Sequence, residues 1–284
     1  MNNGITRTTR RRPWRAFGIM LVAIAASLGM VGTVGTSASA NSRQSSIPKP
    51  TIVLVHGAFA DASSWSGVVQ RLQAKGYNVI APSNPLRGLT IDVQYIKEFL
   101  ATVGGPVVLV AHSYGGMVIT NAAVGNPNVK ALVYIAAFAP DLGDTVASLS
   151  ASAPGSLLGP ATLTIRPYTK PDGTPSAEGY ITPSEYRDVF AADLPRSTAT
   201  TLSVLQKPAD LSILTDPSGA PAWKTIPSWY MVARQDKAIP PDAERTMAKR
   251  AGSTTVEVNG SHSVAVSHPI AVADLILAAA RSLG

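Results

Sequence analysis

The sequence predicts an α/β fold: a doubly wound, mostly parallel six-stranded sheet between layers of helices, with an inserted lid. Two observations predict the sheet. Six short apolar segments have the composition of buried strands, and segments with the apolar spacing of helices alternate with them. A third observation predicts the lid, because a long stretch rich in Pro, Gly, Ser, Thr and Ala interrupts the alternation after the fourth apolar segment.

Most of the six predicted strands are largely apolar, and 51–55 and 106–111 are continuous apolar runs. The first, TIVLV, is rich in β-branched residues, which is typical of a strand covered on both faces in a parallel sheet. In chain order the predicted strands are 51–55, 77–81, 106–111, 129–136, 227–233 and 254–258. Ligands of such sheets bind beyond the carboxyl ends of the strands, so the residues that follow each strand are candidates for a functional site.

The helices are predicted from apolar spacing and from start and stop signals. Apolar residues at 91, 95, 96, 99 and 100 follow the period of an amphipathic helix. Gly76 is expected to end the first helix, and Ser267 is expected to cap the last one. In chain order the predicted helices are 62–75, 91–102, 114–124, 241–251 and 268–282.

The predicted lid covers about residues 141–226, between the fourth and fifth strands. It carries weak helical patterns at 183–192 and 196–206. Long excursions of this kind inside a compact domain usually serve function, so we expect the lid to cover the site.

The N-terminal segment predicts export. Residues 1–40 hold five arginines and no acidic residue, then a largely apolar stretch, and end in Ala38-Ser39-Ala40, an A-x-A cleavage signal. An uncleaved membrane anchor is the alternative, and the sequence does not distinguish the general secretory route from twin-arginine export. We expect a signal peptide over 1–40, a linker over 41–50 and a secreted domain over 51–284 that has no stable association with membranes.

The net charge does not predict a nucleic-acid partner. The chain has 24 Lys and Arg against 17 Asp and Glu; without the five leader arginines the balance is 19 against 17, a net +2. No basic stripe with interleaved aromatic residues follows the leader, which argues against nucleic acid as a partner. The sequence has no cysteine and therefore no disulfide framework.

Ser113 is the candidate nucleophile. The run VVLVAHSYGG over 107–116 predicts a buried strand that turns sharply at Ser113 and continues as a helix, which would expose the hydroxyl at the edge of the sheet. The usual pattern is G-x-S-x-G, and here Ala111 replaces the first glycine. A phosphate-binding loop is the alternative, but no lysine follows at the required spacing and no G-x-G-x-x-G is present.

A serine nucleophile needs a base, and the sequence contains four histidines. His262 lies in the loop after the last strand, at the same edge of the sheet as Ser113, and is therefore the candidate base. The other three, His56, His112 and His268, are expected to be structural; His112 should point away from its neighbour Ser113, and His268 should be a surface or capping residue.

Asp236 is the candidate acid that orients the histidine. It follows the fifth strand and precedes His262, which gives the chain order Ser, Asp, His. Asp141 and Asp144 are alternatives because they follow the fourth strand. Asp242 is expected in the first turn of a helix, where a carboxylate interacts favourably with the helix dipole.

Two backbone N–H groups are candidates for an oxyanion hole. Ala58 follows the first strand, and Tyr114 follows the nucleophile, so both N–H groups should lie at the same edge of the sheet. Phe59 and Trp65 are candidates for lining the substrate pocket, with ordinary core packing as the alternative.

The motifs H-G-A-F, A-H-S-Y-G-G, A-R-Q-D-K-A-I-P-P and N-G-S-H together resemble the α/β-hydrolase superfamily. The branch that they resemble most includes small bacterial esterases and plant methylesterase- and hydroxynitrile-lyase-like proteins, which also lack the first two strands of larger hydrolases. The resemblance spans about residues 50–284 and is weakest in the lid. It implies an α/β-hydrolase fold, a Ser–His–Asp triad, an acyl-enzyme intermediate, and no cofactor or metal.

The predicted function is hydrolysis of small to medium hydrophobic carboxylic esters, with a small-molecule ester as the partner. One alternative on the same triad is a hydroxynitrile lyase, for which Lys237 beside Asp236 would matter, or a cofactor-free perhydrolase or haloperoxidase. Another is a non-catalytic ligand-binding protein on a hydrolase scaffold. The oligomeric state is not predicted.

Overall fold

The computed structural model describes residues 49–283. The predicted signal peptide, 1–40, and most of the predicted linker, 41–50, lie outside the described residues, so export is not addressed by the structure. Within residues 49–283, no helix combines the length and the apolar character that a bilayer-spanning segment needs.

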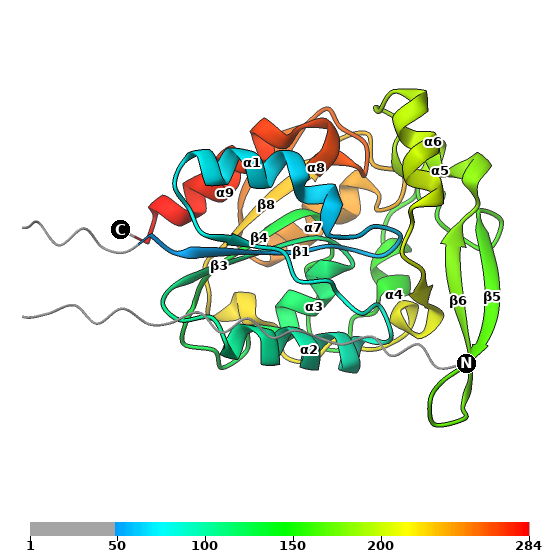
Figure 1. Ribbon diagram of the computed structural model, residues 1–284, viewed down its shortest axis with the longest axis horizontal. Helices are drawn as coiled ribbons and strands as arrows, with labels where there is room; N and C mark the ends of the chain where they lie inside the picture. Colours follow the sequence, from blue (N-terminus) through cyan, green and yellow to red (C-terminus); the bar gives the residue numbers. More distant parts are fainter. Residues whose placement is uncertain (1–48, 284) are drawn as a thin grey trace, which may run out of the picture. The chain divides into compact units, whose positions relative to one another are not determined.

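The main sheet has six parallel strands, as the sequence predicts (Figure 1). Its spatial order is β2-β1-β3-β4-β8-β9, so β3 and β4 are central, and the chain starts at β1 and reaches both edges of the sheet. The strands are β1 (Thr51–Val55), β2 (Val79–Ile80), β3 (Val107–Ser113), β4 (Val129–Ala137), β8 (Ser228–Ala233) and β9 (Thr254–Val258). Fully buried strand interiors match the continuous apolar runs that predicted them.

Helices cover both faces of this sheet, and each face has its own apolar core (Figure 1). On one face lie η1 (Ala62–Trp65), α1 (Ser66–Ala74), α8 (Val264–Ser267) and α9 (Pro269–Arg281). On the other face lie α2 (Leu89–Ala101), α3 (Gly115–Ala122) and α7 (Pro241–Arg250). Each predicted helix is present, with bounds that differ by a few residues.

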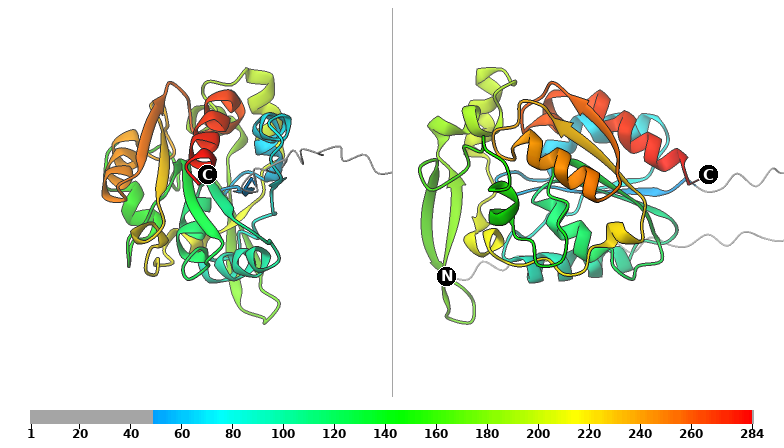
Figure 2. Two further views of the ribbon diagram at one scale, coloured as in Figure 1. Left: turned by 90° about the vertical axis from the view of Figure 1, so that its left-hand side faces the viewer. Right: turned by 180° about the vertical axis from the view of Figure 1, so that it is seen from behind.

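The segment between β4 and β8 contains more regular structure than the sequence predicts. The predicted helical patterns correspond to α5 (Pro183–Phe190) and α6 (Arg196–Val204). The segment also contains a three-stranded antiparallel sheet that the sequence did not predict, which stands at one end of the domain (Figure 2). The strands of this small sheet are β5 (Leu163–Thr169), β6 (Pro175–Ile181) and β7 (Ala209–Asp210). The other elements of the segment are α4 (Val146–Ser150), η2 (Leu211–Leu214) and η3 (Ala222–Lys224).

Two details of the prediction are wrong. The second strand shortens to two residues, because it is an edge strand that pairs only with β1. Ser267 does not cap the last helix: α9 begins at Pro269 with His268 as the N-cap residue. The Ser267 hydroxyl instead bonds the His268 ring at 2.8 Å, and Pro269 at the first helical position has no N–H that needs a partner.

Candidate active site

Ser113 occupies a strained turn at the end of β3. Its φ of +55° is unusual for a residue with a side chain, and the next residue, Tyr114, already has helical dihedral angles as the N-cap of α3. Two glycines allow this turn to fit. A Cβ on Gly115 would lie 2.7 Å from the Val55 carbonyl oxygen, and one on Gly116 would lie 2.0 Å from the Phe138 carbonyl oxygen.

Ser113, His262 and Asp236 form a continuous chain of hydrogen bonds. His262 Nε2 lies 2.8 Å from Ser113 Oγ, and His262 Nδ1 lies 2.5 Å from Asp236 Oδ2. All three residues are buried. Because Nδ1 faces a carboxylate, Nδ1 carries the ring proton, and Nε2 is free to accept the proton of the serine hydroxyl.

Asp236 is held by backbone groups of its own loop. The N–H groups of Ala238 and Ile239 both donate to Asp236 Oδ1, at 2.7 and 2.8 Å. These bonds offset the desolvation of the carboxylate and leave Oδ2 directed at His262.

The loop that carries His262 is held from the lid by Asp193. Ser261 donates from its hydroxyl at 2.5 Å and from its N–H at 3.1 Å to the two carboxylate oxygens. Burial opposes ionisation of Asp193, but hydrogen bonds from Ser261 and Ser267 and the nearby His268 together outweigh it and keep the pKa of that carboxyl below its usual value. The Phe190 ring packs edge-on against the His262 ring, with centroids 4.6 Å apart. Sequence reasoning missed both lid residues.

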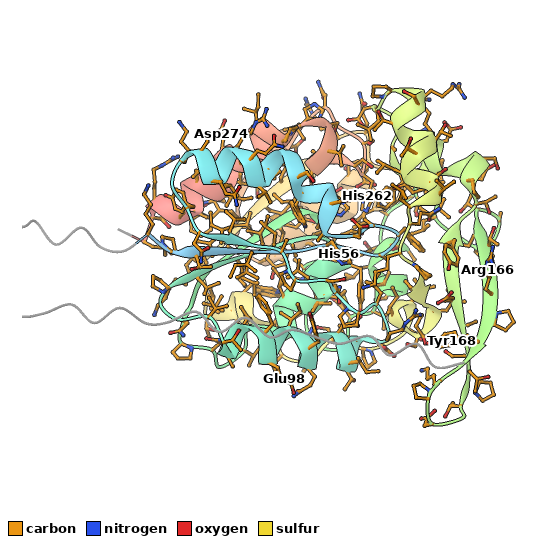
Figure 3. The ribbon with its side chains drawn as sticks, in the orientation of Figure 1. His56, Glu98, Arg166, Tyr168, His262 and Asp274 are labelled. Carbon is orange, nitrogen blue, oxygen red and sulfur yellow. The ribbon has the colours of Figure 1, made fainter. Side chains whose placement is uncertain are left out.

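His56 and His112 are buried and hydrogen-bonded to backbone groups. His56 donates from Nδ1 to the Gly57 carbonyl oxygen and accepts the Asn84 N–H at Nε2; burial lowers its pKa to about 4, so the ring is neutral. His112 donates from Nε2 to the His262 carbonyl oxygen at 2.8 Å, and burial lowers its pKa well below the usual value. Figure 3 shows His56 and His262 near the end of the sheet that faces the lid.

The alternative carboxylates have other partners. Asp141 pairs with Lys224 at 2.7 Å, and Asp144 pairs with Arg250 at 2.6 Å. Asp242 lies in the first turn of α7, as predicted. Asp236 is therefore the carboxylate that contacts His262.

A narrow cavity lies directly over Ser113. Its volume of about 20 Å³ holds on the order of one water molecule. Ala58, Tyr114 and His262 line it, and within residues 49–283 the N–H groups of Ala58 and Tyr114 donate no hydrogen bond. They are therefore free to bind an oxyanion beside Ser113. The Tyr114 hydroxyl is bound to the buried Asp92 at 2.8 Å, which fixes this residue.

A larger cavity of about 470 Å³ adjoins the first one, beneath the lid. Five apolar residues line both cavities, so only side chains separate the two spaces: Phe59, Val146, Leu158, Ile213 and Leu214. The remaining lining is mostly apolar and comes from the lid.

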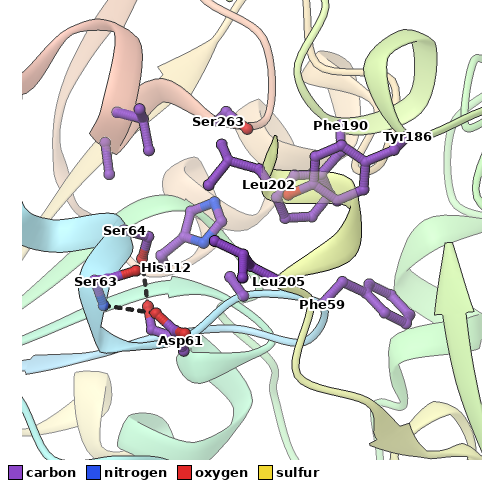
Figure 4. Close-up of a pocket in the computed structure, with 13 residues that line it drawn as sticks. Phe59, Asp61, Ser63, Ser64, His112, Tyr186, Phe190, Leu202, Leu205 and Ser263 are labelled. Atoms are coloured by element: carbon purple, nitrogen blue, oxygen red, sulfur yellow. Dashed lines mark hydrogen bonds between the residues drawn. The ribbon is translucent and has the colours of Figure 1, made fainter. Parts of the chain in front are cut away.

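The two predicted pocket residues have different environments. Phe59 lines the Ser113 cavity and the larger cavity. It also lines a third cavity of about 30 Å³, which His112 lines as well (Figure 4). Trp65 does not line these cavities: its side chain is fully buried in the apolar core between the sheet and the helices α1 and α9, which is the core-packing alternative.

The arrangement can perform acyl transfer. The serine hydroxyl can transfer its proton to a neutral imidazole, the carboxylate can stabilise the resulting imidazolium, and two free N–H groups can bind the developing oxyanion. In the described part of the chain, no group of three or more His, Cys, Asp and Glu side chains has the arrangement of a metal site.

Comparisons with known proteins identify the family and the fold. A model of the Alpha/beta hydrolase family matches residues 52–275. The chain is 27% identical over 254 residues to Alpha/beta hydrolase nvfD of Aspergillus novofumigatus, which covers 82% of this chain and 97% of that protein. It is 28% identical over 263 residues to the pyrethroid hydrolase of Sphingobium wenxiniae, covering 79% and 85%. The crystal structure of polyneuridine aldehyde esterase superposes with a TM-score of 0.70 at 19% identity, covering 81% and 99%.

Gly57→Ala tests the close packing around the nucleophile. A Cβ at this position would lie 2.5 Å from Ser113 Cβ, so the turn must shift, and we expect kcat/KM for esters to fall about 10²-fold. Gly104→Ala is the control, because nothing lies within 4 Å of a Cβ there and its activity should equal wild type. Wild-type ester turnover by folded Gly57→Ala would contradict this account.

Proposed function

The chain belongs to the alpha/beta hydrolase family, and from this premise we propose that it is a secreted serine hydrolase that cleaves carboxylic esters. The observation that carries the proposal is the hydrogen-bonded chain from Ser113 Oγ through His262 to Asp236. Each of the three side chains is buried in the geometry that its proposed role requires.

In the proposed mechanism, Ser113 Oγ attacks the ester carbonyl while His262 Nε2 takes its proton. The N–H groups of Ala58 and Tyr114 bind the oxyanion of the tetrahedral intermediate. His262 then gives the proton to the leaving alcohol, which departs and leaves an acyl group on Ser113. Water, activated by the same imidazole, attacks the acyl group, and Ser113 leaves with the proton from His262.

The proposed substrates are small to medium hydrophobic esters. The 470 Å³ cavity falls within the size range of small-molecule sites, and its wall is shared with the cavity over Ser113. The larger hydrophobic part of the ester would occupy this cavity. Relatives named as a carbendazim hydrolyzing esterase and a pyrethroid hydrolase support ester-like substrates of this character.

Ester hydrolysis accounts for the site better than hydroxynitrile cleavage. The lysine considered for the latter, Lys237, is exposed and does not line the cavity over Ser113. The same triad could support perhydrolysis or halogenation without a cofactor, but no observation favours those reactions.

The triad assignment predicts a graded loss of ester turnover. We expect Ser113→Ala to lose at least ~10³-fold in kcat on a panel of nitrophenyl esters of rising acyl length, and Asp236→Ala to lose less because the carboxylate orients the base. Asp144→Ala, whose carboxylate pairs with Arg250 instead, should retain most activity. Retained turnover by Ser113→Ala would refute the assignment.

The cavity assignment predicts a change in substrate preference. Ser150 lies on α4 and lines the 470 Å³ cavity, so Ser150→Phe should fill it and lower kcat/KM for bulky hydrophobic esters at least ~10-fold relative to acetate esters. Ser197→Phe makes the same change on an exposed position of α6 and should leave the preference unchanged. Equal losses on acetate and bulky esters would contradict the assignment.

The proposed export by a cleaved signal peptide predicts the first residue of the mature protein. When the full chain is expressed in a secreting bacterial host, the protein recovered outside the cytoplasm should begin at Asn41, immediately after Ala38-Ser39-Ala40. N-terminal sequencing checks this, and an intact leader on the exported protein would support the membrane-anchor alternative.

A further inference from the structure

Glu244 is a fully buried acidic residue that the mechanism does not use. It lies on α7, on the helix face that packs against the sheet. Its Oε2 accepts the Ala233 N–H at 3.1 Å, whereas its Oε1 has no partner among residues 49–283 when the group is treated as a carboxylate. A buried ionised carboxylate with one donor and one orphaned oxygen would be costly, which indicates that this group has another protonation state.

Three titratable or charged groups lie around Glu244. The Tyr230 hydroxyl donates its proton to the Ala137 carbonyl oxygen, so it cannot donate a hydrogen bond to Glu244. Arg245, on the same helix, is directed to the surface and pairs with Glu257 and Asp242. The third group is the buried Asp236, whose N–H donates to the Ala233 carbonyl oxygen at 3.1 Å. Because Glu244 binds the N–H of the same Ala233, the two carboxyls are neighbours.

Two adjacent buried carboxyls cannot both be ionised, and the partners decide which one is. Asp236 receives two backbone N–H bonds and the His262 ring N–H, whereas Glu244 receives a single backbone N–H. Asp236 is therefore the anion. Burial, reinforced by the charge of Asp236, raises the pKa of Glu244 well above its usual value.

We propose that Glu244 is a positioning residue that stays protonated and donates a hydrogen bond from its carboxyl group to Asp236. A carboxylate has about four lone-pair sites. Ala238 and Ile239 occupy both sites of Oδ1, and His262 occupies one of Oδ2, so the Glu244 proton fills the site that remains. This bond fixes the plane of the carboxylate that orients His262 and moderates its basicity.

The inference rests on the proposed function for its catalytic meaning, but the protonation of Glu244 can be measured without any activity. The unfolded chain loses this proton above pH 4.5, whereas the native chain keeps it, so the native state is favoured less as pH rises. Between pH 5 and 7, the unfolding constant of wild type relative to that of Glu244→Gln should rise with pH, by up to about tenfold per pH unit, the limit for one proton.

Asp242→Asn is the matched control for the unfolding experiment. It removes an exposed carboxylate from the same helix, so its unfolding constant should stay parallel to that of wild type across this range. If the ratio of the wild-type unfolding constant to that of Glu244→Gln does not change with pH, the proposal is overturned, whatever the enzyme's activity.

The pH profile of kcat/KM separates positioning from simple packing. Glu244→Gln keeps an N–H donor toward Asp236 and an acceptor for Ala233, so it should stay within about threefold of wild type. Glu244→Leu removes the donor, which makes Asp236 more basic; kcat should fall about tenfold, and the acidic limb of the profile should move to higher pH.

Two outcomes of the kinetic experiment are decisive. Equal losses in the Gln and Leu variants with an unmoved acidic limb would overturn the positioning role. If Glu244→Leu does not fold, the unfolding ratio for Glu244→Gln still decides the proposal. A pH-dependent unfolding ratio in a protein without Ser113-dependent ester turnover would refute the proposed function and leave the protonation of Glu244 standing.

Discussion

At Ser113 the chain leaves β3 with a φ of +55°, and the rest of the site depends on the backbone contacts that hold this turn. Three glycines allow two backbone segments to approach it. Gly57 and Gly115 admit the end of β1 and the loop that follows, and Gly116 admits Phe138 directly after β4. A side chain at any of the three would meet atoms at 2.0–2.7 Å. The packing therefore compensates a local strain that a lone β-turn could not sustain, and it places the hydroxyl at the edge of the sheet.

The same edge concentrates buried polar groups, and their hydrogen bonds set which of them is charged. His56 and His112 are neutral because burial disfavours their charged forms and backbone groups fix their tautomers. Asp236 collects three N–H donors, while Glu244, buried beside it, has one. With Glu244 protonated as proposed, Asp236 is the carboxylate anion that contacts the His262 ring, which is the arrangement that proton transfer from Ser113 requires.

The sequence is informative where one local physical rule decides the structure. Continuous apolar runs predicted β1, β3, β4 and β8. The ends of β3, β8 and β9 led us to expect Ser113, Asp236 and His262 at one edge of the sheet. The lid sheet escaped prediction because β5 is largely exposed and contains Pro167, so neither burial nor alternation marks it as a strand. Trp65 was misplaced because an aromatic residue after a strand can face either the core or a cavity.

Residues that act by positioning other residues could not be predicted from the sequence either. Asp193 and Glu244 lie on segments whose local pattern predicts only a loop and a helix face, and their importance comes from partners 68 and 11 residues away along the chain. They contact different parts of the site. Asp193 holds the loop of His262 from the lid, whereas Glu244 lies against Asp236 from α7. The lid is consequently part of the framework of the proposed site as well as a cover, since it contacts His262 and its loop while its apolar side chains enclose the space next to Ser113.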